Sequence, residues 1–169
     1  SAQSILLTDD AAFADAVAAA VTAQLQTLPR ATIAAQSWDS FGAIIVVPSL
    51  NEAPELIDRI APEHLQLAVN DPAALMARVR NAGAIFLGRH TPEAIGDYIA
   101  GPNHVLPTAR AARYASGLSV LDFMKRTTII GCTPDALAAL APAAMTLAAS
   151  EGLDAHGRSI AIRLNPRGL

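Results

Sequence analysis

Residues 43–47 read AIIVV, an unbroken apolar run in which β-branched side chains predominate. Such a run is typical of a strand that is buried on both faces, as strands are in parallel sheets. Parallel strands are joined by crossover segments that are usually helical, so helical patterns are expected on both sides of the run. Pro48 ends the run. This one segment therefore favours a layered α/β fold.

Strand and helix patterns alternate over roughly the first hundred residues, with polar caps, prolines and glycines at most of the boundaries. The expected strands are residues 5–8, 43–47, 65–69 and 84–87. The expected helices run from Asp9-Asp10 to a stop at Pro29, from 31 to about 38 with an end at Gly42, from 52 to 60, from Asp71-Pro72 to Gly83, and onward from Thr91. The alternation predicts an α/β fold with a partial doubly wound (Rossmann-like), mainly parallel sheet.

The pattern changes after Gly101, where irregular and then polar, extended sequence continues to Ile130. Residues 133–135 (TPD) then cap a helix rich in alanine and leucine. Pro142 should kink this helix or split it in two, because proline lacks the backbone N–H of a helix interior.

The tail from Asp154 carries a short helical pattern, followed by apolar residues at 160, 162 and 164 whose alternation fits an edge strand. We therefore predict two parts. Residues 1–108 form the α/β part, and residues 109–169 form a mostly helical C-terminal arm. A chain that leaves its sheet for such an arm often docks the arm on a partner subunit, so we expect a dimerisation arm.

Composition and charge exclude several classes of function. The chain is 52% hydrophobic but only 4% aromatic, which favours closely packed helices over an all-β fold. The net charge of −3, without a cluster of basic residues, makes nucleic acid and anionic membranes poor partners. No apolar run approaches the ~20 residues that a membrane-spanning helix needs. Cys132 is the only cysteine, which excludes an internal disulfide and a thiolate metal cage and is consistent with a cytoplasmic protein.

The dipeptide Glu63-His64 is the first candidate for chemistry. It lies between the helix break at Pro62 and the strand expected from Leu65, so both side chains could reach one cleft at a bend. An imidazole can accept a proton near neutral pH, and a carboxylate beside it can activate a water molecule. The alternative is an ordinary pair of charges at the end of a helix.

Two further pairs could take part in chemistry. Asp97 precedes the Gly-Pro-Asn turn and His104 follows it, so the two side chains could share a metal or a hydrogen bond, or Asp97 could simply cap a helix. Glu151 and His156 converge only if Gly152 ends their helix, and otherwise they belong to a solvated loop. His90 lies in a polar turn and is taken as a surface residue. Two glycine-rich phosphate-binding motifs, G-x-G-x-x-G and the P-loop, are both absent from the sequence.

Five segments together carry a resemblance that none of them carries alone. They are APEHL at 61–65, GAIFLG at 83–88, GDY at 96–98, GPNHVLPT at 101–108 and EGLDAH at 151–156. In this order they resemble histidinol dehydrogenase over essentially the whole chain, and the NHVLPT stretch is highly specific. The resemblance implies oxidation of L-histidinol through the aldehyde to L-histidine, with two successive hydride transfers to two NAD, in histidine biosynthesis.

The same resemblance implies a role for each matching residue. His64 is expected to be the base that removes the alcohol proton, and Glu63 to activate the water that attacks the aldehyde. Asp97 and His156 match two of the zinc ligands. The positions that contact the substrate are His64, Asp97, His104, Glu151 and His156. The resemblance also implies a homodimer in which the arm, with Glu151 and His156, completes the site of the partner subunit.

The resemblance covers only the C-terminal part of a longer enzyme. In the family, a glutamine and a histidine just before the position of Ser1 supply the other two zinc ligands, and the NAD-binding region also lies upstream. The start at Ser1 without a methionine is consistent with a cut, processed or engineered chain. We therefore expect these 169 residues alone to bind zinc weakly and to lack turnover. The alternative reading is a dimerising fragment without activity.

The position of Glu63-His64 conflicts with a general rule. Sites in open parallel sheets usually lie at the carboxyl ends of strands, yet this pair precedes the strand expected from Leu65. Either the expected strand is misassigned, or the family places its site differently because the site lies between domains.

Overall fold

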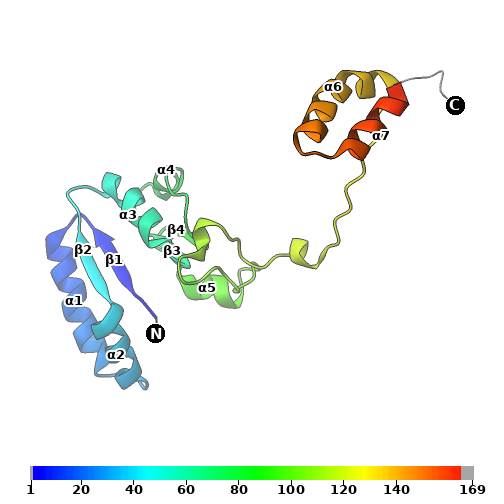
Figure 1. Cartoon of the computed structure of the whole chain (residues 1–169). Helices are drawn as coiled ribbons and strands as arrows, with labels where there is room; N and C mark the ends of the chain where they lie inside the picture. Colours follow the sequence, from blue (N-terminus) through cyan, green and yellow to red (C-terminus); the bar gives the residue numbers. More distant parts are fainter. Residues whose placement is uncertain (1, 165–169) are drawn as a thin grey trace. The chain divides into compact units, whose positions relative to one another are not determined.

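The computed structural model describes residues 2–164. By its internal contacts the chain divides into two compact units, Ser1–Phe123 and Met124–Leu169 (Figure 1). The first unit contains every strand of the described chain, and the regular elements described in the second are two helices. Residues 109–123, which the sequence pattern assigned to the arm, belong to the first unit. Dimerisation through the arm stays a prediction.

The first unit begins with a parallel strand pair and two helices. Strand β1 (Ile5–Thr8) pairs in parallel with β2 (Ala43–Val46), and the crossover between them contains α1 (Ala11–Leu25) and α2 (Ala31–Phe41). These elements agree with the sequence pattern. The side chain of Asp10 caps α1 by accepting a hydrogen bond from the backbone N–H of Phe13, at 3.0 Å.

Strand β2 is less buried than its sequence predicts. Its first three residues are half-buried and Val46 is 49% exposed, so the expectation of burial on both faces is wrong for the described chain. The reason is that β2 has β1 as its only strand neighbour among residues 2–164.

A second parallel pair and three helices follow within the same unit. They are α3 (Ala53–Ile60), β3 (His64–Leu67), α4 (Pro72–Met76), β4 (Ala84–Leu87) and α5 (Glu93–Tyr98). Strand β3 pairs with β4 in parallel, with His64 opposite Ala84 and Gln66 opposite Phe86. The predicted α/β fold with parallel strands is confirmed, and the described strands are divided between two short sheets.

Three predicted boundaries in this region are wrong. Strand β3 ends at Leu67 and not at residue 69. Strand β3 begins at His64 and not at Leu65, because the backbone N–H of Ala84 already bonds to Glu63 O at 2.9 Å and starts the ladder there. Helix α4 ends at Met76, so Gly83 does not close it. Gly83 instead lets two backbone segments come close, because a Cβ atom there would lie 2.5 Å from Glu63 O and only glycine permits this approach.

Beyond α5 the first unit is irregular, as predicted. The 3₁₀ turns at Ala111–Arg113 and Val120–Phe123 are the regular elements of this stretch. Arg113 reaches back across the unit and donates a hydrogen bond to the carbonyl of Arg59 near the end of α3, at 2.5 Å. Arg110 donates to the same carbonyl. The irregular segment is thereby tied to the helix that leads into β3.

The second unit is a pair of helices, α6 (Pro134–Ser150) and α7 (Asp154–Leu164). Thr133 caps α6 as predicted, with its hydroxyl oxygen accepting from the N–H of Ala136 at 3.2 Å. Pro142 does not split α6, which continues through it. The small residues Ala141 and Ala148 are buried in this unit and allow close packing between the helices.

The edge strand predicted at residues 160–164 is wrong, because these residues continue α7. The two-residue alternation there is short. The packing of α7 against α6 overrides this weak local preference for a strand. The two helices lie so close that a Cβ atom at Gly157 would lie 3.9 Å from the Cβ of Ala148. Within residues 2–164, no helix is both long and apolar enough to cross a membrane.

Candidate functional site

The site starts at the turn between α3 and β3. Ala61 ends α3 with left-handed backbone (φ 48°), and Pro62 directs the chain into β3. His64 is thus the first residue of β3, so it lies at the amino end of this strand. The correction of the strand by one residue does not move the site to a carboxyl end, and the usual rule for open sheets does not hold here.

Phe86 supports the His64 ring from the neighbouring strand. The register pairs His64 with Ala84 and Gln66 with Phe86, so the side chains of His64 and Phe86 lie on the same face of the pair. Their ring centroids are 5.9 Å apart and the ring planes are tilted by 37°. Phe86 is only 7% exposed, and this buried ring limits how the imidazole can tilt.

Helix α5 lies close to the Phe86 ring because of a glycine. A Cβ atom at Gly96 would lie 2.4 Å from Cε1 of Phe86, so any larger residue would push α5 away from β4. Gly96 separates Glu93 from Asp97 in the sequence of α5. The close approach therefore sets how near these two carboxylates come to His64.

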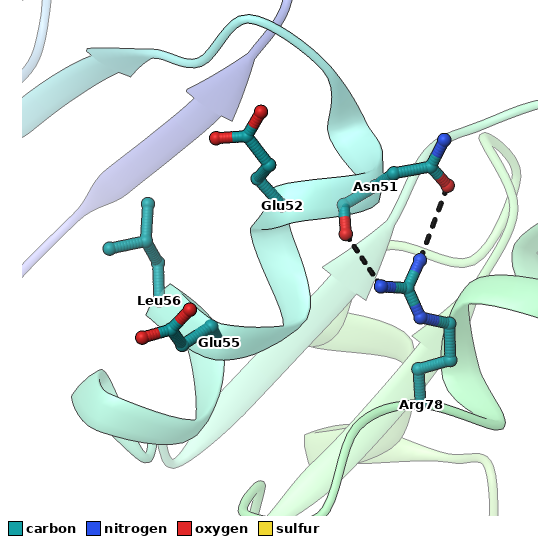
Figure 2. Close-up of a pocket in the computed structure, with 5 residues that line it drawn as sticks. All are labelled: Asn51, Glu52, Glu55, Leu56 and Arg78. Atoms are coloured by element: carbon teal, nitrogen blue, oxygen red, sulfur yellow. Dashed lines mark hydrogen bonds between the residues drawn. The ribbon is translucent and has the colours of Figure 1, made fainter.

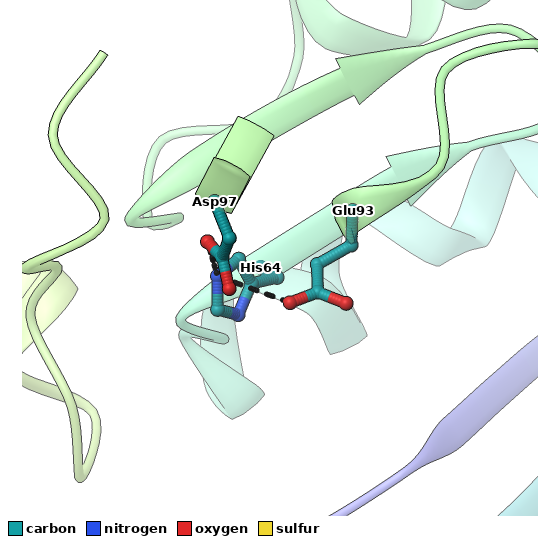
Figure 3. Close-up of side chains that lie close together, drawn as sticks. All are labelled: His64, Glu93 and Asp97. Atoms are coloured by element: carbon teal, nitrogen blue, oxygen red, sulfur yellow. Dashed lines mark hydrogen bonds and ion pairs between the residues drawn. The ribbon is translucent and has the colours of Figure 1, made fainter. Parts of the chain in front are cut away.

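Glu93 and Asp97 are four residues apart on α5, a spacing that puts their side chains on one face of the helix. Both point toward His64 (Figure 3). Nε2 of His64 lies 3.3 Å from Oδ1 of Asp97 and 3.7 Å from Oε1 of Glu93. The side chains of His64, Asp97 and Glu93 are 24%, 29% and 47% exposed, so the group is partly shielded yet open to a ligand.

We call these three residues the His64 cluster. Each offers one potential ligand atom, and the three atoms lie within 4.8 Å of one another. A nitrogen and two carboxylate oxygens can hold a divalent cation such as zinc. They can equally orient an imidazole for proton transfer, because a carboxylate accepts the hydrogen of a ring N–H and thereby fixes the ring.

A scan against protein-family models matches residues 1–164 to the family described as histidinol dehydrogenase. The chain belongs to the histidinol dehydrogenase family. It is 66% identical over 166 residues to histidinol dehydrogenase from Rhodospirillum rubrum, covering 98% of this chain and 38% of the relative. The corresponding protein of Bradyrhizobium diazoefficiens is 67% identical over 165 residues, again covering 98% of this chain and 38% of that protein.

A solved structure agrees with this assignment. Histidinol dehydrogenase from Elizabethkingia anophelis matches with a TM-score of 0.87 and 35% identity, over 96% of this chain and 37% of that one. The chain therefore spans less than two fifths of the length of the histidinol dehydrogenases it matches. The family resemblance seen in the sequence motifs is confirmed.

Within the part of the chain that the structure describes, the predicted site residues are only partly brought together. His64 and Asp97 are in direct contact, and the reading of Asp97 as a helix cap is wrong, because α5 has its C-cap at Ile99. Glu63 is half-buried, and among the described residues no hydrogen bond or ion pair joins its side chain to the His64 cluster.

The other predicted residues lie farther along the chain. His104 is exposed in the irregular segment, and no hydrogen bond to Asp97 is formed within residues 2–164. Helix α6 ends at Ser150, and Gly152 follows with φ +71°, as the convergence of Glu151 and His156 requires. Both side chains are exposed, with Glu151 at the end of α6 and His156 inside α7, so the loop reading is wrong for His156.

Glu93 is the residue that sequence reasoning missed. The sequence pattern identifies Glu93 only as part of the start of a short helix after Thr91. The signal was its spacing, because Glu93 precedes Asp97 by one helical turn and a helix there puts both carboxylates on one side. Without the fold, nothing linked that side of the helix to His64.

A separate shallow hollow lies at the start of α3 (Figure 2). Its lining residues are Asn51, Glu52, Glu55, Leu56 and Arg78. Arg78 donates to the backbone carbonyl of Asn51 at 2.7 Å and to its side-chain oxygen at 3.2 Å, which ties the end of α4 to the turn before α3. No member of the His64 cluster lines the hollow, and its one cation is engaged in these bonds.

Proposed function

We propose that this chain supplies catalytic residues of an NAD-dependent histidinol dehydrogenase that oxidises L-histidinol through the aldehyde to L-histidine, in histidine biosynthesis. The observation that carries the proposal is the contact between Nε2 of His64 and Oδ1 of Asp97, at 3.3 Å, in a chain of this family. The contact joins the residue expected to move protons to a residue expected to bind the metal and the substrate.

In this proposal His64 accepts the proton of the substrate alcohol. Its surroundings suit that role, because the Phe86 ring and the carboxylates of α5 restrain the imidazole while about a quarter of the side chain stays accessible. Glu63 activates the water that attacks the aldehyde. Glu63 directly precedes His64, and its backbone is anchored by the hydrogen bond from Ala84, which fixes the point from which its side chain extends.

The donor chemistry of Asp97 fits a zinc ion. Its carboxylate is partly accessible and belongs to a group of nitrogen and oxygen donors, which is the mixed set that zinc accepts. We propose that Asp97 and His156 are two of the zinc ligands, and that His104 and Glu151 contact the substrate. Zinc at this position would hold the imidazole and the amine of L-histidinol. The assignment of Glu151 and His156 rests on the family motifs alone.

The family resemblance assigns the remaining zinc ligands and the NAD-binding residues to sequence outside these 169 residues. It also supports a homodimer in which the second unit completes the site of the partner subunit. The competing proposal is a fragment that dimerises without activity.

The test measures NADH formation from L-histidinol by the 169-residue chain alone, and then by the same chain mixed with the remaining part of a histidinol dehydrogenase. We expect no turnover from the chain alone and zinc-dependent turnover from the mixture. Turnover by the chain alone would overturn the fragment reading. If neither the mixture nor a continuous full-length enzyme carrying these residues forms NADH, the proposed function is wrong.

A further inference from the structure

Glu93 has no role in the assignments above, yet its Oε1 lies 3.7 Å from Nε2 of His64. It stands in the first turn of α5, one helical turn before Asp97. Its side chain is 47% exposed and forms no other hydrogen bond or ion pair among the described residues. Within residues 2–164, its carboxylate therefore interacts with the imidazole alone.

Under the proposed function, Asp97 alone does not fix the orientation of the His64 imidazole. A carboxylate that binds zinc shares its oxygen lone pairs with the metal, so Asp97 becomes a weaker partner for a ring N–H. Rotation about the Cβ–Cγ bond of a histidine has broad, roughly two-fold preferences, and packing against Phe86 restrains the tilt of the ring without distinguishing its nitrogen edge from its carbon edge. Another acceptor must then hold Nε2 toward α5.

We infer that Glu93 is a positioning residue for His64: its carboxylate holds the imidazole with Nε2 facing α5 while Asp97 serves the metal. Three structural observations carry this inference. Glu93 and Asp97 project from the same face of α5, both approach the same ring nitrogen, and Gly96 lets the helix come close enough for both to reach it. The inference rests on the proposed function, because it concerns the residue that moves protons in that reaction.

The effect of losing Glu93 should fall on the chemical step. An imidazole that samples the wrong orientation is unavailable for proton transfer part of the time, which lowers kcat, whereas the other expected substrate contacts, Asp97, His104, Glu151 and His156, are untouched. Hydrogen-bonding partners that orient metal ligands typically contribute about 10- to 100-fold, and we expect the same scale for a partner that orients an acid–base group. We expect Glu93→Ala to lower kcat by roughly 10- to 100-fold, with KM changed by less than about twofold.

The experiment uses the full-length, zinc-loaded enzyme that carries these residues, with Glu93→Ala, Glu93→Gln and the control Glu55→Ala. Glu55 is an exposed glutamate in the first turn of α3, so its removal matches the change in charge and helix position. Glu93→Gln keeps an acceptor oxygen and should recover part of the lost kcat. Glu55→Ala should keep the kcat of the unaltered enzyme.

A second readout separates positioning from metal binding. The zinc affinity of Glu93→Ala, measured by competition with a chelator, should equal that of the unaltered enzyme. A fall in zinc affinity as large as that of Asp97→Ala would make Glu93 a zinc ligand and overturn the inference. A kcat within twofold of the unaltered enzyme would overturn it too. Failure of the proposed function is distinguishable, since the unaltered full-length enzyme would then form no NADH, or His64→Ala would leave its kcat unchanged.

Discussion

Gly96 of α5 faces the edge of the Phe86 ring so closely that a β-carbon at position 96 would lie 2.4 Å from Cε1 of Phe86. Carbon atoms in a protein interior pack at about 3.5–4.0 Å, so the two residues leave no room for a side chain. Because Glu93 and Asp97 belong to the same short helix as Gly96 and carry the carboxylates that meet His64, this contact controls the geometry of the site.

We expect Gly96→Ala to destabilise the first unit by about 1–3 kcal/mol, because the methyl group forces α5 or the buried Phe86 ring to move. Turnover of the full-length enzyme should fall as well, since the carboxylates of α5 move with the helix. Denaturant unfolding and NADH formation measure the two effects. Gly131→Ala is the matched control, because a Cβ atom there meets nothing within 4 Å. Equal unfolding midpoints for the two variants would contradict the prediction.

Replacing His64 by alanine should lower kcat by about 10²- to 10⁴-fold, the usual contribution of a positioned acid–base group. Zinc content should remain near normal, because the proposed ligands are other residues. Activity with L-histidinol and metal analysis of the same full-length preparation give both values. Loss of zinc with retained turnover would be incompatible with the proton-transfer role. His90, exposed in a turn after β4, provides the control substitution His90→Ala.

Removal of the charge of Asp97 tests the proposed metal site directly. We expect Asp97→Asn to weaken zinc binding at least about tenfold, since an amide oxygen is a poorer zinc ligand than a carboxylate. Zinc competition with a chelator measures the change. Asp39→Asn, at an exposed position on α2, controls for the lost charge. An unchanged zinc affinity in Asp97→Asn would remove Asp97 from the ligand set.

Asp58 joins α3 to the segment that leads into β4. Its Oδ1 accepts hydrogen bonds from the backbone N–H groups of Arg80 at 2.8 Å and Asn81 at 2.9 Å. Asp58→Ala leaves both donors without this partner, and we expect it to lower the free energy of unfolding by about 1–3 kcal/mol. Asp58→Asn keeps one acceptor oxygen and should lose less. Equilibrium unfolding of both variants tests the prediction, and equal stability of Asp58→Ala and the unaltered chain would refute it.

The sequence predicted those parts of the fold that depend on neighbouring residues. The strands predicted at 5–8, 43–47 and 84–87 agree with the structure to within one residue, and so do the caps Asp10 and Thr133, because side-chain patterns and capping act over a few residues. The boundaries failed where distant contacts compete with local preference. Residues 160–164 are helical because α7 packs on α6. Gly83 does not end a helix, and it allows the backbone of Glu63 to come close.

The sequence by itself determined the family and the identity of most candidate residues, since the motifs around Glu63-His64, Asp97 and His104 are contiguous and specific. Only the tertiary structure decided which of these residues meet. The contact of His64 with Asp97 joins positions 33 residues apart, and it depends on strand register, the buried Phe86 ring and the absence of a side chain at Gly96. Glu93 became a candidate for the same reason, because packing turned one face of a short helix toward an imidazole.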